Sequence, residues 1–158
     1  MNMQLDRYDR QLLKLLQQEG RISNQDLAER VSLSPSACLR RVRALEEAGF
    51  ITAYRAVLDA RKLGLSLMVL VHISMDRHTA ERFNHFETEV AKIPQVLECL
   101  LITGQAADYQ LKVVVADMDD YQQLLLNRLT RIPGVSGVHS SFVLRRVIDN
   151  PALPLGGA

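Results

Sequence analysis

The sequence predicts an α+β protein made of two parts, because its apolar residues follow two different patterns along the chain. Apolar residues recur at helical spacing through the first 50 residues, whereas from Leu65 to Met75 they alternate with the period of two of a β-strand. A polar stretch, residues 59–64, separates the two patterns and is expected to be a linker. Of the 158 residues, 47% are hydrophobic and 23% are charged, which favours a folded chain over a disordered one.

The N-terminal part is expected to hold three helices, and the first two have recognisable starts. The first covers residues 7–19, with Asp6 as its N-cap. The second begins at Ser23, whose spacing to Asp26 matches a capping box, and it ends near Val31.

The third helix is predicted over residues 35–48. Ser34 is a suitable N-cap, Pro35 fits the first helical position, and Gly49 can end the helix in the left-handed conformation. A short helix, a tight turn and a longer helix form the helix-turn-helix layout. Because residues 50–58 are rich in β-branched and aromatic types, they predict a strand or small wing, which completes a three-helix winged helix-turn-helix domain over residues 1–58.

The third helix has two distinct faces. With about 100° of rotation per residue, Cys38, Val42 and Leu45 share the core side, and Arg41 at its flank is expected to pack or pair within the domain. Arginine forks suit guanine edges and phosphates, and hydroxyls near a helix start can add further contacts. We therefore predict that the outward face contacts DNA through Ser34, Ser36, Arg40 and Arg43.

The charge distribution agrees with nucleic-acid binding at the N-terminal end. Residues 1–64 contain 11 Lys and Arg against 8 Asp and Glu, a net charge of +3. Residues 65–158 contain 8 against 10, a net charge of −2. A basic part joined to a slightly acidic one fits a protein that contacts DNA at one end.

The C-terminal part, residues 65–148, is predicted to be a ferredoxin-like sandwich with the order β-α-β-β-α-β. The two segments Lys92–Val96 and Arg131–Val135 echo each other, each closing a helix and opening a strand, as in a duplicated plan. The Pro- and Gly-rich residues 149–158 are expected to form a flexible tail. The strands are expected at residues 65–75, 96–103, 109–116 and 135–147, with helices following Thr79 and Asp117.

Several runs of this sequence resemble the Lrp/AsnC family, the leucine-responsive and feast/famine regulators. The matching runs are Leu5–Leu13, Leu33–Tyr54, Pro94–Cys99, Thr103-Gly104, Asp108-Tyr109 and Ile132–Val135, and the resemblance covers about residues 4–148. It implies a bacterial or archaeal transcription regulator that dimerises through its ferredoxin-like domains, often assembles into octamers, and binds a small amino acid between dimers.

The resemblance also implies an effector site, which an amino acid could use as follows. Backbone N–H groups of the Gly104-Gln105-Ala106 loop would receive the ligand carboxylate, because glycine permits close approach. Asp108 would receive the ammonium group, and Ser140 could add a hydrogen bond. The family usually places two residues between this Gly and Asp, whereas three intervene here, so a simple strand-to-strand turn is the alternative interpretation.

The predicted mechanism is that of a homodimer that forms larger assemblies, and an amino acid is expected to regulate these assemblies. Two symmetry-related helices would enter successive major grooves about 34 Å apart on a pseudo-palindromic operator. An effector bound in an octamer, a tetramer of dimers, would act by favouring one assembly state. Without a signal peptide or a long apolar run, the protein is expected in the cytoplasm, associated with the nucleoid, with no cofactor, metal or catalytic residue.

Two other functions are compatible with this sequence. Some proteins of the same two-domain plan are enzymes that process tetrapyrroles with histidines, for which His72, His85 and His139 are candidates. The other alternative is an architectural DNA-binding protein that responds to no effector. A Soret band would favour the enzyme, and calorimetry against amino acids would separate a sensor from an architectural protein.

Overall fold

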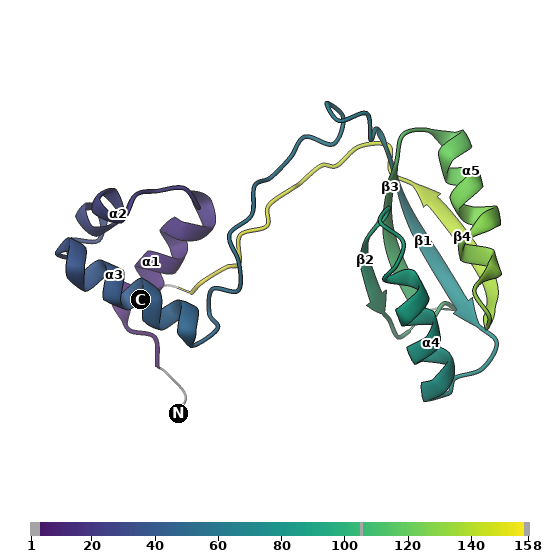
Figure 1. Ribbon diagram of the computed structural model, residues 1–158, viewed down its shortest axis with the longest axis horizontal. Helices are drawn as coiled ribbons and strands as arrows, with labels where there is room; N and C mark the ends of the chain where they lie inside the picture. Colours follow the sequence, from purple (N-terminus) through teal and green to yellow (C-terminus); the bar gives the residue numbers. More distant parts are fainter. Residues whose placement is uncertain (1–3, 105, 157–158) are drawn as a thin grey trace. The chain divides into compact units, whose positions relative to one another are not determined.

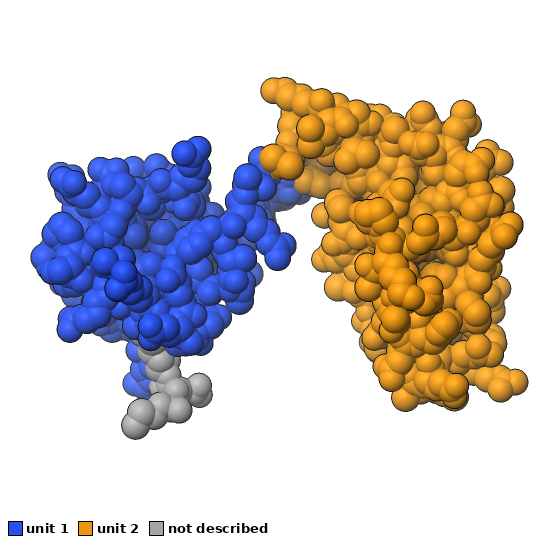
Figure 2. Space-filling view, viewed as in Figure 1, with its two compact units in different colours: residues 1–57, 148–158 blue, residues 58–147 orange. Residues whose placement is uncertain are grey.

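A computed structural model of the chain describes residues 4–104 and 106–156, which form two compact units (Figures 1 and 2). Unit 1 combines the residues up to Val57 with the residues from Ile148 onward, and unit 2 spans Leu58–Val147. The chain therefore passes between the units twice, and unit 2 is inserted into unit 1. Residues 149–156, which we expected to form a flexible tail, belong with unit 1.

Unit 1 contains the three helices expected from the sequence. They are α1 (Arg7–Gln18), α2 (Asn24–Arg30) and α3 (Pro35–Glu47). Each follows an N-cap residue in extended backbone conformation whose side chain accepts a hydrogen bond from the amide three residues later, and these caps are Asp6, Ser23 and Ser34. The polar cap residues thus decide where each helix begins.

The capping box lies at a different helix from the one predicted. At α2, the Ser23 hydroxyl donates to the Asp26 carboxylate at 2.6 Å, so the Asp26 side chain turns to the hydroxyl and not to the Ser23 amide. The reciprocal box forms at α1, where the amide of Asp9 donates to Asp6 and the amide of Asp6 donates to Asp9. An Asp-x-x-Asp spacing was the signal for this box in the sequence.

The turn between α2 and α3 requires one residue in the left-handed region. Ser32 has a φ of 56°, and the following amide, Leu33, donates to the carbonyl of Ala28 at 2.9 Å. This conformation is unusual for a residue with a Cβ atom. After α3, Gly49 adopts a φ of 77°, which confirms its predicted role as the left-handed residue after the helix.

Unit 1 has its own apolar core. The helices pack through side chains at helical spacing, and the two α3 residues Cys38 and Leu45 have no exposed surface. Buried apolar residues of this core are Leu12, Leu27, Ala28, Val31, Cys38 and Leu45.

The strand predicted at residues 50–58 does not form. The structure gives these residues no strand and no pairing partner, and Val57 and Leu58 are mostly exposed. A strand becomes stable only when it pairs with a neighbour, and β-branched composition by itself supplies none.

Unit 2 has the predicted order of elements (Figure 1). The sheet order is β2-β3-β1-β4, and all three pairings are antiparallel, which is the ferredoxin-like arrangement. In chain order the elements are β1 (Leu67–Met75), α4 (Ala80–Val90), β2 (Val96–Leu101), β3 (Tyr109–Val115), α5 (Met118–Asn127), the short 3-10 helix η1 (Leu129–Arg131) and β4 (Val135–Phe142).

Both long helices of unit 2 cover the same face of the sheet. Phe86 of α4 and Tyr121 of α5 belong to one core cluster with Val69, Val71 and Ile73, the alternate residues of the central strand β1. The side chains between them on β1 point to the opposite face and are half-buried in the single chain. This alternation is the reason that β1 could be recognised from its sequence.

The last strand is shorter than predicted. It ends at Phe142 instead of Val147, and Leu144 and Val147 are exposed. Beyond Phe142 the amide of Val143 continues the pairing by donating to the carbonyl of Met68. The apolar pattern of residues 143–147 therefore continues past the residues that pair with β1.

Candidate functional site

Helix α3 presents one polar face to solvent. Cys38 and Leu45 are fully buried and Val42 is half-buried, so these three anchor the helix against the core. Their burial turns the other side of the helix outward. All four residues predicted to contact DNA are exposed, namely Ser34, Ser36, Arg40 and Arg43.

Hydrogen bonds hold the start of α3 in place. The Ser34 hydroxyl accepts from the Ala37 amide at 3.3 Å and lies 3.3 Å from the Ser36 hydroxyl. The Asn24 side chain donates to the carbonyl of Pro35 at 2.8 Å and so connects α2 to the first turn of α3. The two serine hydroxyls and the first amides of α3 therefore share one exposed end, where a phosphate can accept hydrogen bonds.

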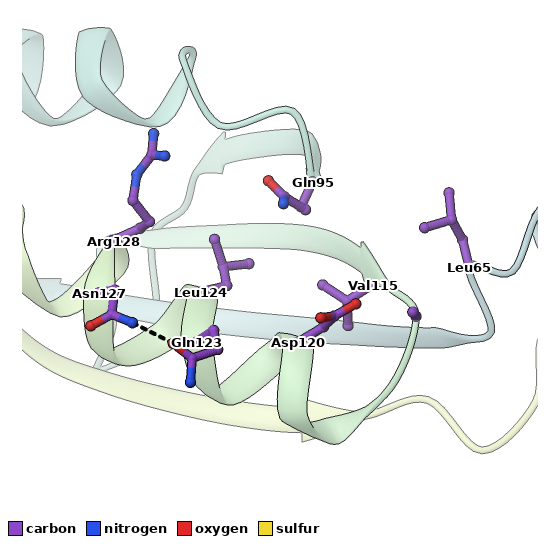
Figure 3. A pocket seen from close by; sticks show the side chains of 9 residues that line it. Leu65, Gln95, Val115, Asp120, Gln123, Leu124, Asn127 and Arg128 are labelled. Carbon is purple, nitrogen blue, oxygen red and sulfur yellow. Dashed lines mark hydrogen bonds between the residues drawn. The ribbon is translucent and has the colours of Figure 1, made fainter.

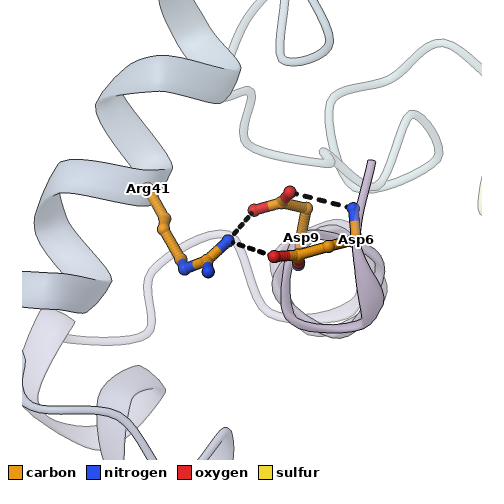
Figure 4. A network of polar contacts seen from close by, with 3 residues as sticks. All are labelled: Asp6, Asp9 and Arg41. Carbon is orange, nitrogen blue, oxygen red and sulfur yellow. Dashed lines mark hydrogen bonds and ion pairs between the residues drawn. The ribbon is translucent and has the colours of Figure 1, made fainter. Parts of the chain in front are cut away.

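The three arginines of α3 have different surroundings. Arg41 donates from Nη1 to Asp6 Oδ2 and to Asp9 Oδ1, both at 2.8 Å (Figure 4). Its guanidinium also lies 5.3 Å from the centre of the Tyr8 ring. This confirms that Arg41 pairs within the domain. In the part of the chain that the structure describes, Arg40 and Arg43 have no side-chain partner.

The Arg41 network shifts the ionisation of its members. The hydrogen bond that Arg41 donates to the Asp9 carboxylate raises the pKa of Arg41 above its ordinary value. The backbone amide of Asp9, together with the Arg41 guanidinium, lowers the pKa of the Asp6 carboxyl. The charges of Arg41 and Asp6 are thus stabilised by each other, and this arginine is not available to a ligand outside.

The predicted effector loop joins β2 to β3 and is tied to the end of β1. Gly104 has a φ of 84°, and the carbonyl of Ala106 accepts from the Ser74 hydroxyl at 3.0 Å. The Asp108 amide donates to the carbonyl of Ile73 at 2.8 Å. Gln105, also predicted to belong to this site, lies outside the described residues.

Both carboxylate oxygens of Asp108 already have partners. Oδ2 accepts from the Met75 amide at 2.7 Å, and Oδ1 lies 2.9 Å from His78 Nε2. The His78 side chain is 69% exposed, so it can leave without disturbing the core. The sequence gives no signal for His78, because the residue is 30 positions away from Asp108 and no local pattern connects the two.

Ser140 lies apart from this loop. It pairs across the sheet with Val71 of β1, and its hydroxyl contacts the hydroxyl of Tyr121 beneath α5. Its side chain therefore lies on the helix-covered face of the sheet. The loop, in contrast, is hydrogen-bonded to Ile73 and Ser74 near the end of β1. Within one chain, the structure does not bring Ser140 together with Asp108.

A separate hollow of about 360 Å³ lies beside α5 (Figure 3). Its walls combine the apolar Leu65, Val115 and Leu124 with polar side chains, among which the Asn127 amide donates to Gln123 at 2.6 Å. None of the described residues predicted for the effector site lines it. The remaining lining residues are Gln95, Ala116, Asp120 and Arg128.

The histidines proposed for an enzyme do not form a cluster with acidic or sulfur ligands. His72 lies 3.2 Å from the Gln110 side chain, and its ring centre is 6.5 Å from that of His139. Among the described residues, no group of three or more His, Cys, Asp or Glu could hold a metal ion. No helix in the described part of the chain has the length and apolar composition needed to cross a membrane.

Two family models match the chain, one over its N-terminal part and one over its C-terminal part. A model of winged helix-turn-helix DNA-binding domains matches residues 5–52, and the Lrp/AsnC ligand binding domain matches residues 68–153. This chain belongs to the Lrp/AsnC family. As an Lrp/AsnC transcriptional regulator it combines a DNA-binding domain with a ligand-binding domain, which supports a regulatory role over the two alternatives.

Relatives of this Lrp/AsnC regulator cover nearly its whole length. The Bkd operon transcriptional regulator of Pseudomonas aeruginosa is 44% identical over 96% of this chain and 99% of its own. The leucine-responsive regulatory protein of Escherichia coli K12 is 46% identical over 90% of this chain and 87% of its own.

Solved structures agree with the fold. A transcriptional regulator of Neisseria meningitidis, crystallised as a complex with L-Met, superposes with a TM-score of 0.92 at 38% identity and covers 96% of this chain and 97% of its own. An AsnC family regulator of Agrobacterium tumefaciens superposes with a TM-score of 0.90 at 33% identity, with the same coverage.

Proposed function

We propose that this Lrp/AsnC regulator binds operator DNA sequence-specifically through the outward face of α3. Arg40 and Arg43 would contact bases and phosphates, while Ser34 and Ser36 would bind phosphates at the start of the helix. The observation that carries the proposal is the contrast within α3: Arg41 is held by Asp6 and Asp9, whereas Arg40 and Arg43 are exposed without a described side-chain partner. A pseudo-palindromic operator would accommodate the two α3 helices of a homodimer.

Replacement of Arg40 with Ala tests the DNA contact. If Arg40 reads a guanine, the variant should lose on the order of 1–3 kcal/mol of binding free energy, measured by fluorescence anisotropy on a selected operator. Arg77→Ala is the matched control, because it removes the same charge from an exposed position in unit 2. If both variants lost the same binding free energy, a general effect of charge would explain the loss, and Arg40 would not be part of the interface.

The proposed effector is a small amino acid bound at the loop between β2 and β3. Its carboxylate would accept from backbone N–H groups of the segment Gly104–Ala106, which includes Gln105, and its ammonium group would replace His78 on Asp108. Ser140 could contribute from another subunit of the assembly, since it lies apart from the loop within one chain. The L-Met complex of the Neisseria relative makes methionine a natural first ligand to test.

The proposed assembly is a homodimer that forms an octamer in the cytoplasm, in association with the nucleoid. An effector bound between dimers would act only through its different affinity for the two assembly states. Thermal shift against the twenty amino acids, combined with light scattering, tests both points, because a ligand that binds the folded state stabilises it. If no amino acid changed the melting temperature or the size, an architectural role without an effector would replace this proposal.

A further inference from the structure

The C-terminal segment of the chain is attached to helix α1. Gln17 lies in the last turn of α1, and its side-chain amide makes two hydrogen bonds with the backbone of Leu153. Nε2 donates to the Leu153 carbonyl at 3.0 Å, and Oε1 accepts from the Leu153 amide at 2.9 Å. One side chain thus satisfies both backbone groups of a residue 136 positions away, as a neighbouring strand would.

The segment around Leu153 is shaped by its own sequence. The Asn150 side chain accepts from the Ala152 amide at 3.1 Å, and the Leu155 amide donates to the Leu153 carbonyl at 2.9 Å. Pro151 and Pro154 restrict the backbone between these turns. A segment that is already turned in this way loses less conformational entropy when it binds.

The contact is made mainly through the backbone. The Leu153 side chain is 70% exposed, whereas Ala152 and Leu155 are half-buried. Two hydrogen bonds at an exposed position make an attachment that can open and close, because each such bond contributes only modestly to stability in water.

This attachment changes how the two units are connected. Unit 2 begins at Leu58 and ends at Val147, so a free tail would leave unit 1 joined by a single segment, whereas the bound tail joins it by two. Two connections allow a smaller range of relative motion than one, and a restricted range raises the effective concentration of a second binding event.

We propose that residues 148–156 form a strap that closes onto Gln17 and limits the motion of the helix-turn-helix unit relative to unit 2. In a dimer, the closed strap holds the separation between the two α3 helices and thereby makes DNA binding sensitive to half-site spacing. The effect on DNA binding rests on the proposed function, whereas the restraint on motion does not depend on it.

Gln17→Met tests the strap, with Gln18→Met as the matched control. Methionine keeps the length and helix propensity of glutamine but has no amide, and Gln18 is the exposed neighbour without a described bond to the tail. In full-length protein, we expect hydrogen exchange at the Leu153 amide to accelerate roughly tenfold in Gln17→Met and to be unchanged in Gln18→Met. An unprotected Leu153 amide in the parent protein, or equal exchange in the two variants, would overturn the strap.

The restriction of motion has a separate readout. Spin labels on Gln11→Cys in α1 and Glu81→Cys in α4 report the distance between the units, with Cys99 changed to Ser and labelled subunits diluted in unlabelled protein. The distance distribution should broaden when Gln17→Met is added and stay unchanged with Gln18→Met. A width that did not respond to Gln17→Met would contradict the strap as a restraint.

The consequence for DNA is measured on duplexes that carry two selected half-sites, either in phase or separated by five additional base pairs. The parent protein should bind the in-phase duplex more tightly, and Gln17→Met should reduce this preference several-fold at unchanged affinity for a single half-site. An undiminished preference would disprove the link to spacing. If the parent protein bound no duplex, the proposed function would be wrong. The hydrogen-exchange and spin-label measurements would still test whether the strap exists and restrains the units.

Discussion

Arg41 of α3 and Asp9 of α1 form an ion pair across unit 1, with 2.8 Å between Nη1 and Oδ1. The Asp9 side chain is only 3% exposed, and the Arg41 side chain is 28% exposed. Asp9 is also the capping-box partner of Asp6, so one carboxylate stabilises the start of α1 and the position of α3 together. The outward face of α3 is therefore oriented by an arginine that does not belong to that face.

Arg41→Ala should destabilise unit 1. The substitution leaves the largely buried Asp9 carboxylate without its cation, and we expect the free energy of unfolding to fall by about 2 kcal/mol, below the range for fully buried pairs because Arg41 is partly exposed. Urea denaturation followed by circular dichroism measures this loss. Arg40→Ala is the control, and it should leave stability within about 0.5 kcal/mol. If both variants unfolded at the same urea concentration, the pair would have no structural role.

The Asp6 cap should make the stability of unit 1 depend on pH in the acid range. Because hydrogen bonding and Arg41 lower the pKa of Asp6 in the folded state, its stabilisation is present above the unfolded pKa of about 3.9 and is lost as pH falls through the lower, folded value. The melting temperature of Asp6→Asn should therefore lie below that of the parent at pH 7, and the gap should narrow near pH 3. A gap that stayed constant across this range would show that Asp6 does not act through its charge.

Ser32→Gly should raise stability slightly. A side chain at a φ of 56° costs on the order of 1 kcal/mol, and part of this gain is offset by the greater freedom of glycine in the unfolded chain. We expect a net gain of about 0.5 kcal/mol, or a few degrees in melting temperature by calorimetry. Ser32→Val should lower the melting temperature. A higher melting temperature with valine would mean that this backbone conformation is not strained.

Arg43→Ala should weaken the salt dependence of DNA binding. If Arg43 binds a phosphate, its loss should reduce the slope of log K against log salt by about 1, and it should weaken binding to all sequences similarly. Fluorescence anisotropy at several salt concentrations provides the slope. A slope equal to that of the parent protein would show that Arg43 does not neutralise a phosphate.

His78→Ala should strengthen amino-acid binding at the proposed effector site. His78 Nε2 lies 2.9 Å from Asp108 Oδ1. Removal of the histidine would leave this oxygen free to bind the ligand ammonium group. Isothermal calorimetry with L-Met should show a several-fold tighter complex, whereas Asp108→Asn should weaken it. Unchanged affinity in both variants would place the ammonium group elsewhere.

The fold and the α3 face could be predicted because both depend on short-range patterns. The alternation from Leu65 to Met75 reflects the burial of alternate β1 side chains, and the helix starts follow from Ser34 and Asp6 as caps for otherwise unpaired amides. The separation of Arg40 and Arg43 from Cys38 and Leu45 follows from helical geometry alone. Local chemistry therefore settled where α3 lies and which residues it turns outward.

Long-range pairing decided the rest, because its partners lie far apart in the sequence. Whether residues 50–58 form a strand depends on a neighbour that only the folded chain could provide, and none pairs with them. Asp108 meets His78, and Gln17 meets Leu153, through the path of the backbone and not through any spacing along it. The residues of this regulator that face outward were thus determined by its sequence, whereas the contacts that restrain its loop and its C-terminal segment were decided by tertiary structure.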